Sequence, residues 1–209
     1  MKTARKVLMI ALCAVLLVSI SVMGTMAYLT SQDTVTNTFT VGNVAITLDE
    51  AKVNTDGTLV TGENAGRTDG NAYHLLPGHT YIKDPTIHVA STSEDCWLFV
   101  KVENGIAAIE DSSSTIAAQM ATKGWAPVAE GSNVYCRTTT NKAGDNVVVF
   151  DNFKISGNAD VSKYATAKNE DGSVATGATV IAVTAYAIQA DGFEGETASD
   201  IWTAANFAA

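Results

Sequence analysis

The sequence predicts a mainly β protein: an antiparallel β-sandwich with short helical insertions, preceded by a signal-peptide helix. The chain is rich in Thr, Ala, Val and Gly, while Leu is scarce after residue 27, and this composition favours strands. Short apolar runs are separated by turns rich in Gly, Asn and Asp, as in sandwiches. The 209 residues are 46% hydrophobic with only 3 Pro, which is enough for one packed core and too little for two ordinary domains after a leader is removed.

Residues 1–27 have the pattern of a secretory signal peptide. An uncharged apolar run of 17 residues follows three basic residues, Lys2, Arg5 and Lys6. Thr25 and Ala27 are the small residues at the −3 and −1 positions, so we expect cleavage before Tyr28. A retained membrane anchor is the alternative, because the run is at the lower limit of length for crossing a bilayer. After cleavage we expect an exported protein with no stable membrane span.

The charge of the chain argues against nucleic acid as a partner. The formal net charge is −9, and removing the three positive charges of the leader from −9 gives −12. Such an acidic protein repels phosphate backbones and anionic lipid surfaces. Since the sequence also lacks a basic cluster, we expect no nucleic-acid partner.

The first part of the domain shows the alternation of a strand. Apolar residues alternate over 39–41 and again over 44–48 on a shifted phase, which predicts a strand with a bulge or tight turn at Gly42-Asn43. Residues 54–72 are polar and Gly-rich, so we expect a long exposed loop or a small hairpin. Pro85 lacks a backbone donor, and the next strand should therefore be an edge strand or begin after it.

The later elements are predicted from their apolar runs. Residues 96–104, CWLFVKVEN, are the strongest strand, apolar on both faces at its start and hence buried. A helix is expected over 114–125, capped by Ser114 and ended by Gly124. Further strands are expected at 134–139, 146–156 and 178–191. A helical tail should follow at 198–207, where the residues in contact with the core are Ile201, Trp202 and Phe207.

The three histidines do not form a recognisable active site. His74 and His79 flank the Pro77-Gly78 turn, and His88 lies in a predicted strand, without the H-E-x-x-H spacing of zinc peptidases. Several acidic turns could offer oxygen atoms to calcium, but none matches an EF-hand loop. We therefore assign no catalytic, cofactor or metal residue and expect no enzyme activity, while calcium and zinc stay open as ligands.

Two cysteines remain once the leader and its Cys13 are removed. Cys96 and Cys136 each lie in an apolar, strand-like run. An exported domain permits a disulfide between them, and two buried free thiols fit the runs equally well.

The segment that joins the leader to the domain resembles a known family. The matching positions are Gly24, Thr25, Ala27, Thr36, Asn37, Phe39, Gly42, Val44, Ile46, Leu48, Asp49 and Glu50. Runs further along, YHLLPGHTYIKDPTIHV, SEDCWLFVKVENGI and AYAIQADGFEG, extend the likeness over nearly the whole chain. The sequence is similar to the TasA/camelysin (CalY) family, which comprises exported proteins of Gram-positive bacteria processed by the SipW signal peptidase.

This resemblance implies a jelly-roll-like sandwich that serves as a fibre subunit in the biofilm matrix or at the cell surface. Residues 28–40 would be a free N-terminal donor segment and 41–209 a single sandwich domain. The donor segment completes the sheet of a neighbour, and its side chains for the neighbour's grooves are Leu29, Val35 and Phe39. Repeated head-to-tail contacts then build a filament. Implied partners are further copies of the chain, a SipW-type signal peptidase and other matrix components.

Three alternatives stay open. Residues 28–38 could be a stub, with 39–48 pairing inside the same subunit. The protein could be a monomeric surface adhesin or binding module, a reading motivated by the exposed 54–72 stretch. It could also be a camelysin-like secreted metallopeptidase, for which the sequence offers no zinc-binding signature.

Overall fold

The computed structural model describes residues 43–164 and 180–207, together with residues 3, 5–7, 9 and 12–15. The chain divides into two units, residues 1–40 and 41–209. The described residues of the first unit are helical. Among all described residues, no helix has both the length and the apolar character needed to cross a membrane.

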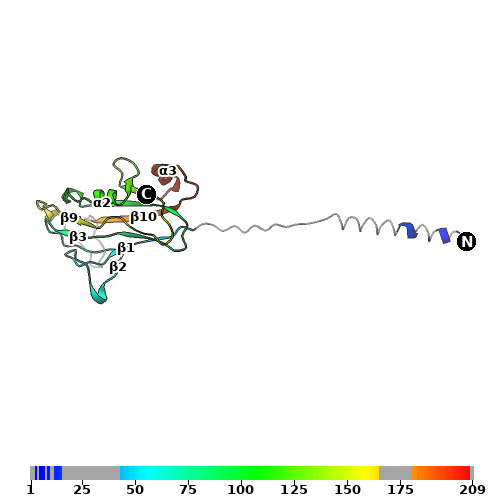
Figure 1. The fold of residues 1–209 in the computed structure, drawn as a ribbon, viewed down its shortest axis with the longest axis horizontal. Coiled ribbons are helices and arrows are strands. Elements are labelled where there is room, and N and C mark those ends of the chain that lie inside the picture. The colour runs from blue at the N-terminus through cyan, green and yellow to red at the C-terminus, as the bar shows by residue number, and fades with distance from the viewer. Residues whose placement is uncertain are drawn as a thin grey trace. The chain divides into compact units, whose positions relative to one another are not determined.

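The second unit consists mainly of antiparallel strands (Figure 1). One sheet has the strand order β2-β1-β4-β8, another has the order β10-β5-β7-β6, and β3 pairs with β9. The first sheet contains β1 (Ile46–Ala51), β2 (Arg67–Thr68), β4 (Thr86–Val89) and β8 (Asn146–Val148). The second contains β5 (Cys96–Asn104), β6 (Trp125–Pro127), β7 (Val134–Arg137) and β10 (Ile181–Gln189). The remaining elements are β3 (Thr80–Ile82), β9 (Asn152–Lys154), α2 (Ile116–Thr122), α3 (Ala198–Ala205) and three 3₁₀ turns, η1 (Gly62–Asn64), η2 (Ala107–Ile109) and η3 (Val161–Tyr164).

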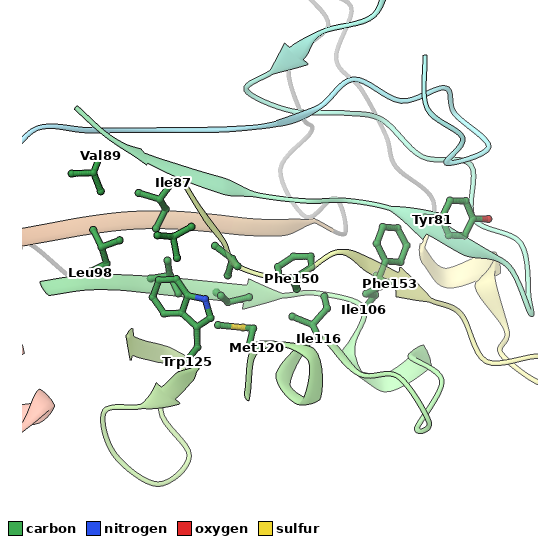
Figure 2. Packing of buried hydrophobic residues seen from close by; sticks show 14 of the residues in the cluster. Tyr81, Ile87, Val89, Leu98, Ile106, Ile116, Met120, Trp125, Phe150 and Phe153 are labelled. Atoms are coloured by element: carbon green, nitrogen blue, oxygen red, sulfur yellow. The ribbon is translucent and has the colours of Figure 1, made fainter. Parts of the chain in front are cut away.

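The two four-stranded sheets share one hydrophobic core. Ile87 and Val89 of β4 point toward Leu98 of β5 in Figure 2, and all three side chains are buried. Alternate residues of each strand face this core because successive side chains point to opposite faces. Helix α2 contributes Ile116 and Met120 to this core.

The other face of the second sheet is covered by α3. Phe99 of β5 lies beneath the helix, with ring centroids 5.4 Å from Trp202 and 6.1 Å from Phe207. Tyr186 of β10 completes this cluster of four rings. Ile201 is buried in the same cluster. The expected helical tail and its three core contacts are therefore confirmed.

Several predicted elements are confirmed, and two need correction. Strand β5 has the predicted bounds, and β4 begins directly after Pro85. The predicted strand 146–156 is wrong, because the chain forms β8 and β9 in different sheets. Consecutive residues Val149 and Phe150 are both buried in the same core cluster, and a regular strand cannot turn two neighbouring side chains to one side. The helix expected over 114–125 is shorter, and Thr115 rather than Ser114 caps it by accepting from Ala118 N.

The Gly-rich stretch after β1 is a short hairpin followed by a brief strand. A bridge between Val53 and Leu59 closes the hairpin, and β2 follows it. Of the first predicted strand, residues 43–48 are described, and residues 46–48 of these belong to β1. Val44, just before β1, and Ile46 and Leu48 within it pack against the core. Residues 28–42 lie outside the described part of the chain.

Candidate functional site

The residues predicted for cleavage and for strand donation lie outside the described residues. They are Thr25, Ala27, Tyr28, Leu29, Val35 and Phe39. Their roles stay predictions. The structure does describe the domain against which such a segment would dock.

Cys96 and Cys136 are buried free thiols, the second of the two alternatives left open by the sequence. Cys136 pairs directly with Phe99 in the sheet, three residues from Cys96 on the same strand. Since side chains alternate along a strand, Cys96 faces the shared core, whereas Cys136 faces α3. A disulfide would have to pass through the sheet, so these two positions do not form one. Burial raises the pKa of Cys96 to about 11 and that of Cys136 to about 12.

Among the described residues, β10 is an edge strand of the second sheet. Its nine residues, IAVTAYAIQ, pair with β5 along their whole length, and no other described strand pairs with them. The backbone bonds Gly105 N to Val180 O and Ala190 N to Asp95 O show that even-numbered residues bond to β5. The odd-numbered ones, such as Val183 and Ala185, therefore direct their N–H and C=O groups outward. An apolar, unpaired edge of this length is a template for a further strand.

The opposite edge of this sheet is protected. Strand β6 has only three residues, and Pro127 at its end has no N–H to offer. Short edge strands and prolines are common means of preventing edge-to-edge pairing. The contrast leaves β10 as the exposed edge within the described part of the sheet.

A pocket of about 360 Å³ lies between the start of β10 and the first sheet. Residues 180–183 line one side, and Leu48 and Glu50 of β1 line another. Strand β1 pairs with β4 on one side along Ile46–Asp49. On its other side it pairs with β2 only at Glu50 and Ala51, so that side has no partner strand from Ile46 to Asp49 among the described residues. Two open strand edges thus border one pocket.

A buried ion pair lines this pocket. Glu50 is 4% exposed and Lys83 is 8% exposed, and Nζ of Lys83 donates to Oε2 of Glu50 at 2.5 Å. Removing two charges from water costs several kcal/mol per ion, and their attraction offsets this only with good geometry and further hydrogen bonds. The ion pair therefore need not stabilise the fold. Its position in a pocket makes both side chains candidates for a chemical role.

Asn71 completes a three-residue group with this pair, here named the Glu50 triad: Glu50, Lys83 and Asn71. The Nδ2 group of Asn71 donates to Oε1 of Glu50 at 2.9 Å and to the carbonyl of Ala51 at 2.8 Å. Its Oδ1 accepts the backbone N–H of Val53 at 3.0 Å. These partners fix which end of the side-chain amide is oxygen and which is nitrogen.

Apolar side chains surround the Glu50 triad. Tyr73, Leu75, Ile106 and Phe153 line the same pocket, and the ring of Tyr73 meets that of Phe153 edge-on at 5.1 Å. Burial, together with the charge of Glu50, raises the pKa of Tyr73, whose hydroxyl donates to the carbonyl of Ile82 at 2.9 Å. Such an enclosure lowers the local dielectric and strengthens the electrostatic interactions inside it.

A second polar network lies beside the first on the partly exposed side of β1. Asp49 binds Nε2 of His88 at 2.8 Å and also binds Arg67, which reaches Asp84 at 3.0 Å. Hydrogen bonds to Asp49 and to Asn146 raise the pKa of His88. Within the described residues, no group of three or more His, Cys, Asp or Glu side chains is arranged to hold a metal ion.

The sequence carries a signal for two members of the Glu50 triad, although they match no short motif. Glu50 continues the inward-facing series of Val44, Ile46 and Leu48, and Lys83 occupies the inward position two residues after the buried Tyr81. A charge at an inward-facing strand position needs a partner. Contact between Glu50 and Lys83 could therefore be predicted from the sequence alone. Nothing in the sequence indicates that Asn71 joins them.

Comparisons of the chain with protein-family models, with curated proteins and with solved structures give no match. The resemblance of the N-terminal segment to the TasA/camelysin family therefore stays a prediction.

Proposed function

We propose that this protein is an exported subunit of an extracellular fibre, in the matrix or at the cell surface, that assembles by strand donation. The observation that carries the proposal is the open, apolar edge of β10 beside the partly open edge of β1. Residues 28–40 of one copy add a strand at this edge of the next copy. The leader pattern and the family resemblance supply the export route through a SipW-type signal peptidase.

The chemistry of the edge supports this occupant. The outward N–H and C=O groups of β10 bind any extended backbone, and the apolar lining of the pocket accepts alternate side chains. Leu29, Val35 and Phe39 are the apolar residues of the segment that would enter the pocket and its surroundings. Donor and acceptor lie on different parts of one chain, so the contact repeats head to tail and builds a filament.

The shared core of the two four-stranded sheets is compatible with a jelly-roll-like sandwich, and we propose this finer fold class. Donation of a further strand would extend the second sheet beyond β10. Other matrix components are proposed as lateral partners.

Electron microscopy of purified protein tests the proposal. Protein that begins at Tyr28 should form filaments, and protein that begins at Val41 should stay monomeric because it lacks the donor. Filaments from both, or from neither, would contradict strand donation and favour internal pairing of residues 39–48.

The acceptor edge is tested separately by Ala185→Pro. This change removes an outward N–H of β10 without removing a bond to β5, so filaments should disappear while the domain stays folded by circular dichroism. The matched control is Ala185→Ser, which retains the N–H and should assemble normally. Equal assembly of the two variants would exclude the β10 edge as the acceptor.

A ligand-binding module is a second candidate, favoured by the pocket itself. Its volume of about 360 Å³ and its mixture of apolar walls with a few polar groups suit a small ligand. A mature protein that is strictly monomeric and binds one defined ligand would support this candidate over the fibre.

A further inference from the structure

We propose that the Glu50 triad forms an internal covalent cross-link: an amide bond between Nζ of Lys83 and Cγ of Asn71, made with Glu50 as the proton carrier and with release of ammonium. The inference rests on the domain alone and does not require fibre assembly. Its basis is that one buried carboxylate holds both reacting groups, each on a different oxygen atom.

The first requirement is a nucleophile beside a proton acceptor. Nζ of Lys83 lies 2.5 Å from Oε2 of Glu50, and both side chains are almost completely buried. The two groups form an ion pair in the structure, and the proposed reaction begins when one proton passes between them. Transfer of one proton from Nζ to the carboxylate leaves a neutral amine, which is the nucleophilic form of lysine.

The second requirement is an activated amide held at the same carboxylate as the lysine. Nδ2 of Asn71 contacts the other oxygen of Glu50, so lysine and asparagine meet at the same carboxylate. The N–H of Val53 donates to Oδ1 of Asn71 at 3.0 Å. That donor polarises the carbonyl and is aimed at the atom where negative charge develops when the amine attacks Cγ.

The reaction balances without a cofactor or an oxidant. The lone pair of Nζ forms a bond to Cγ, and the electrons of the C=O bond move to Oδ1, beside the Val53 N–H. Protons from Nζ pass by way of the Glu50 carboxyl group to Nδ2. The Cγ–Nδ2 bond then breaks, the C=O bond re-forms, and the nitrogen leaves as ammonium while Glu50 returns to its carboxylate form. One C–N bond replaces another, so no group is oxidised or reduced.

The surroundings suit this chemistry. Tyr73 and Phe153 line the pocket beside the triad and place apolar surface against it. The pocket offers a path for ammonium to leave. Residues 71 and 83 flank β3, so the bond would close a loop that contains this strand.

Mass spectrometry of a tryptic digest of the denatured full-length protein tests the proposal. Asn71 lies between Arg67 and Lys83, and the next Lys or Arg is Lys101. A modified Lys83 is not a trypsin site, so we expect peptide 68–101 with a mass lower by one ammonia. A free peptide 68–83 of unchanged mass as the main product would overturn the proposal. Loss of ammonia with normal cleavage after Lys83 would also overturn it, because it indicates a cyclic imide at Asn71 alone.

Two variants and one control test the roles of Glu50 as proton carrier and Lys83 as nucleophile. Glu50→Gln retains hydrogen-bonding capacity without a proton acceptor, and Lys83→Arg retains the positive charge without a usable nucleophile. Both should give peptide 68–83 with its full mass. Lys52→Gln removes an exposed lysine near the site and should leave the cross-link intact. A cross-link that persists in Glu50→Gln would overturn the role of Glu50.

Discussion

Gly57 occupies a position that only glycine tolerates. Its φ is +83°, and an added Cβ would lie 2.6 Å from Cδ1 of Tyr81 and 2.7 Å from Cα of the same residue. Tyr81 is fixed by stacking on Phe153 at 5.0 Å and by its hydroxyl, which donates to His74 O and accepts from the N–H of Leu76. We expect Gly57→Ala to lower the free energy of unfolding by about 3 kcal/mol, measured by urea denaturation.

Gly62 is the matched control for this change. Its φ is +75°, and an added Cβ would meet nothing within 4 Å. Gly62→Ala should therefore cost only backbone strain, about 1 kcal/mol. Equal losses in the two variants would show that contact with Tyr81 contributes nothing.

The buried thiols should be chemically silent in the native protein. Burial raises the pKa of Cys96 and of Cys136 well above neutral, and the thiolate is the reactive form. At about pH 8 we expect an alkylating reagent to label neither residue until the protein is unfolded. Labelling is read by mass spectrometry with and without urea. Fast native labelling at either site would contradict the burial described above.

His88 and Asp49 should make stability depend on pH. The raised pKa of His88 adds stability that is complete below its ordinary value of about 6.5 and is lost as pH rises through the folded-state value. Burial acts to raise the pKa of Asp49, but hydrogen bonds from Arg67 and His88 outweigh it and lower the pKa. The contribution of Asp49 is therefore present above about pH 3.9 and is lost as pH falls through its folded-state value.

The test compares the wild-type protein with His88→Gln in urea. The advantage of the wild type should be about 0.5 kcal/mol larger at about pH 5.5 than at about pH 8.5, a small value because His88 is partly exposed and Arg67 opposes its charge. If the advantage of the wild type is the same at both pH values, the charged contact between His88 and Asp49 does not contribute to stability.

Among the helices, α3 should stabilise the second sheet through its aromatic side chains. Trp202 lies 5.4 Å from Phe99, 5.2 Å from Tyr186 and 5.1 Å from Phe207, measured between ring centroids. We expect Trp202→Ala to cost about 2 kcal/mol, less than for a fully buried tryptophan because this ring is half-buried. Ala204→Ser on the exposed side of the helix is the control and should change stability little. Similar losses in both variants would mean that helix propensity rather than packing holds α3.

The strands and helices differ in how far the sequence predicts them. Strand β5 was predicted well because it begins with a continuous apolar run, and helix α3 because Ile201 and Trp202 stand out in a tail of small and polar residues. The boundary between β8 and β9 was missed, because alternation cannot reveal that both Val149 and Phe150 turn inward. The Glu50 triad was missed because its members are joined by tertiary contacts between residues 50, 71 and 83. Charges at inward positions hint at such contacts, but the partner is found only in the fold.

For the domain as a whole, the shared core predicts a single unfolding transition. Residues of both four-stranded sheets pack into one cluster, so neither sheet can lose its partner without exposing apolar surface. We expect transitions measured by far-ultraviolet circular dichroism and by tryptophan fluorescence to coincide within error. A fluorescence midpoint displaced from that of circular dichroism would show that the sheets unfold separately.

The distribution of tryptophan has a practical consequence. The chain contains 3 Trp, and all belong to the second sheet or to the helix that covers it: Trp97 in β5, Trp125 in β6 and Trp202 in α3. Trp97 is the direct cross-strand neighbour of Ile188 on β10. The protein therefore contains its own optical reporter beside the open edge. Docking of a segment there would change the emission of a native residue, and assembly could be followed in real time without any label.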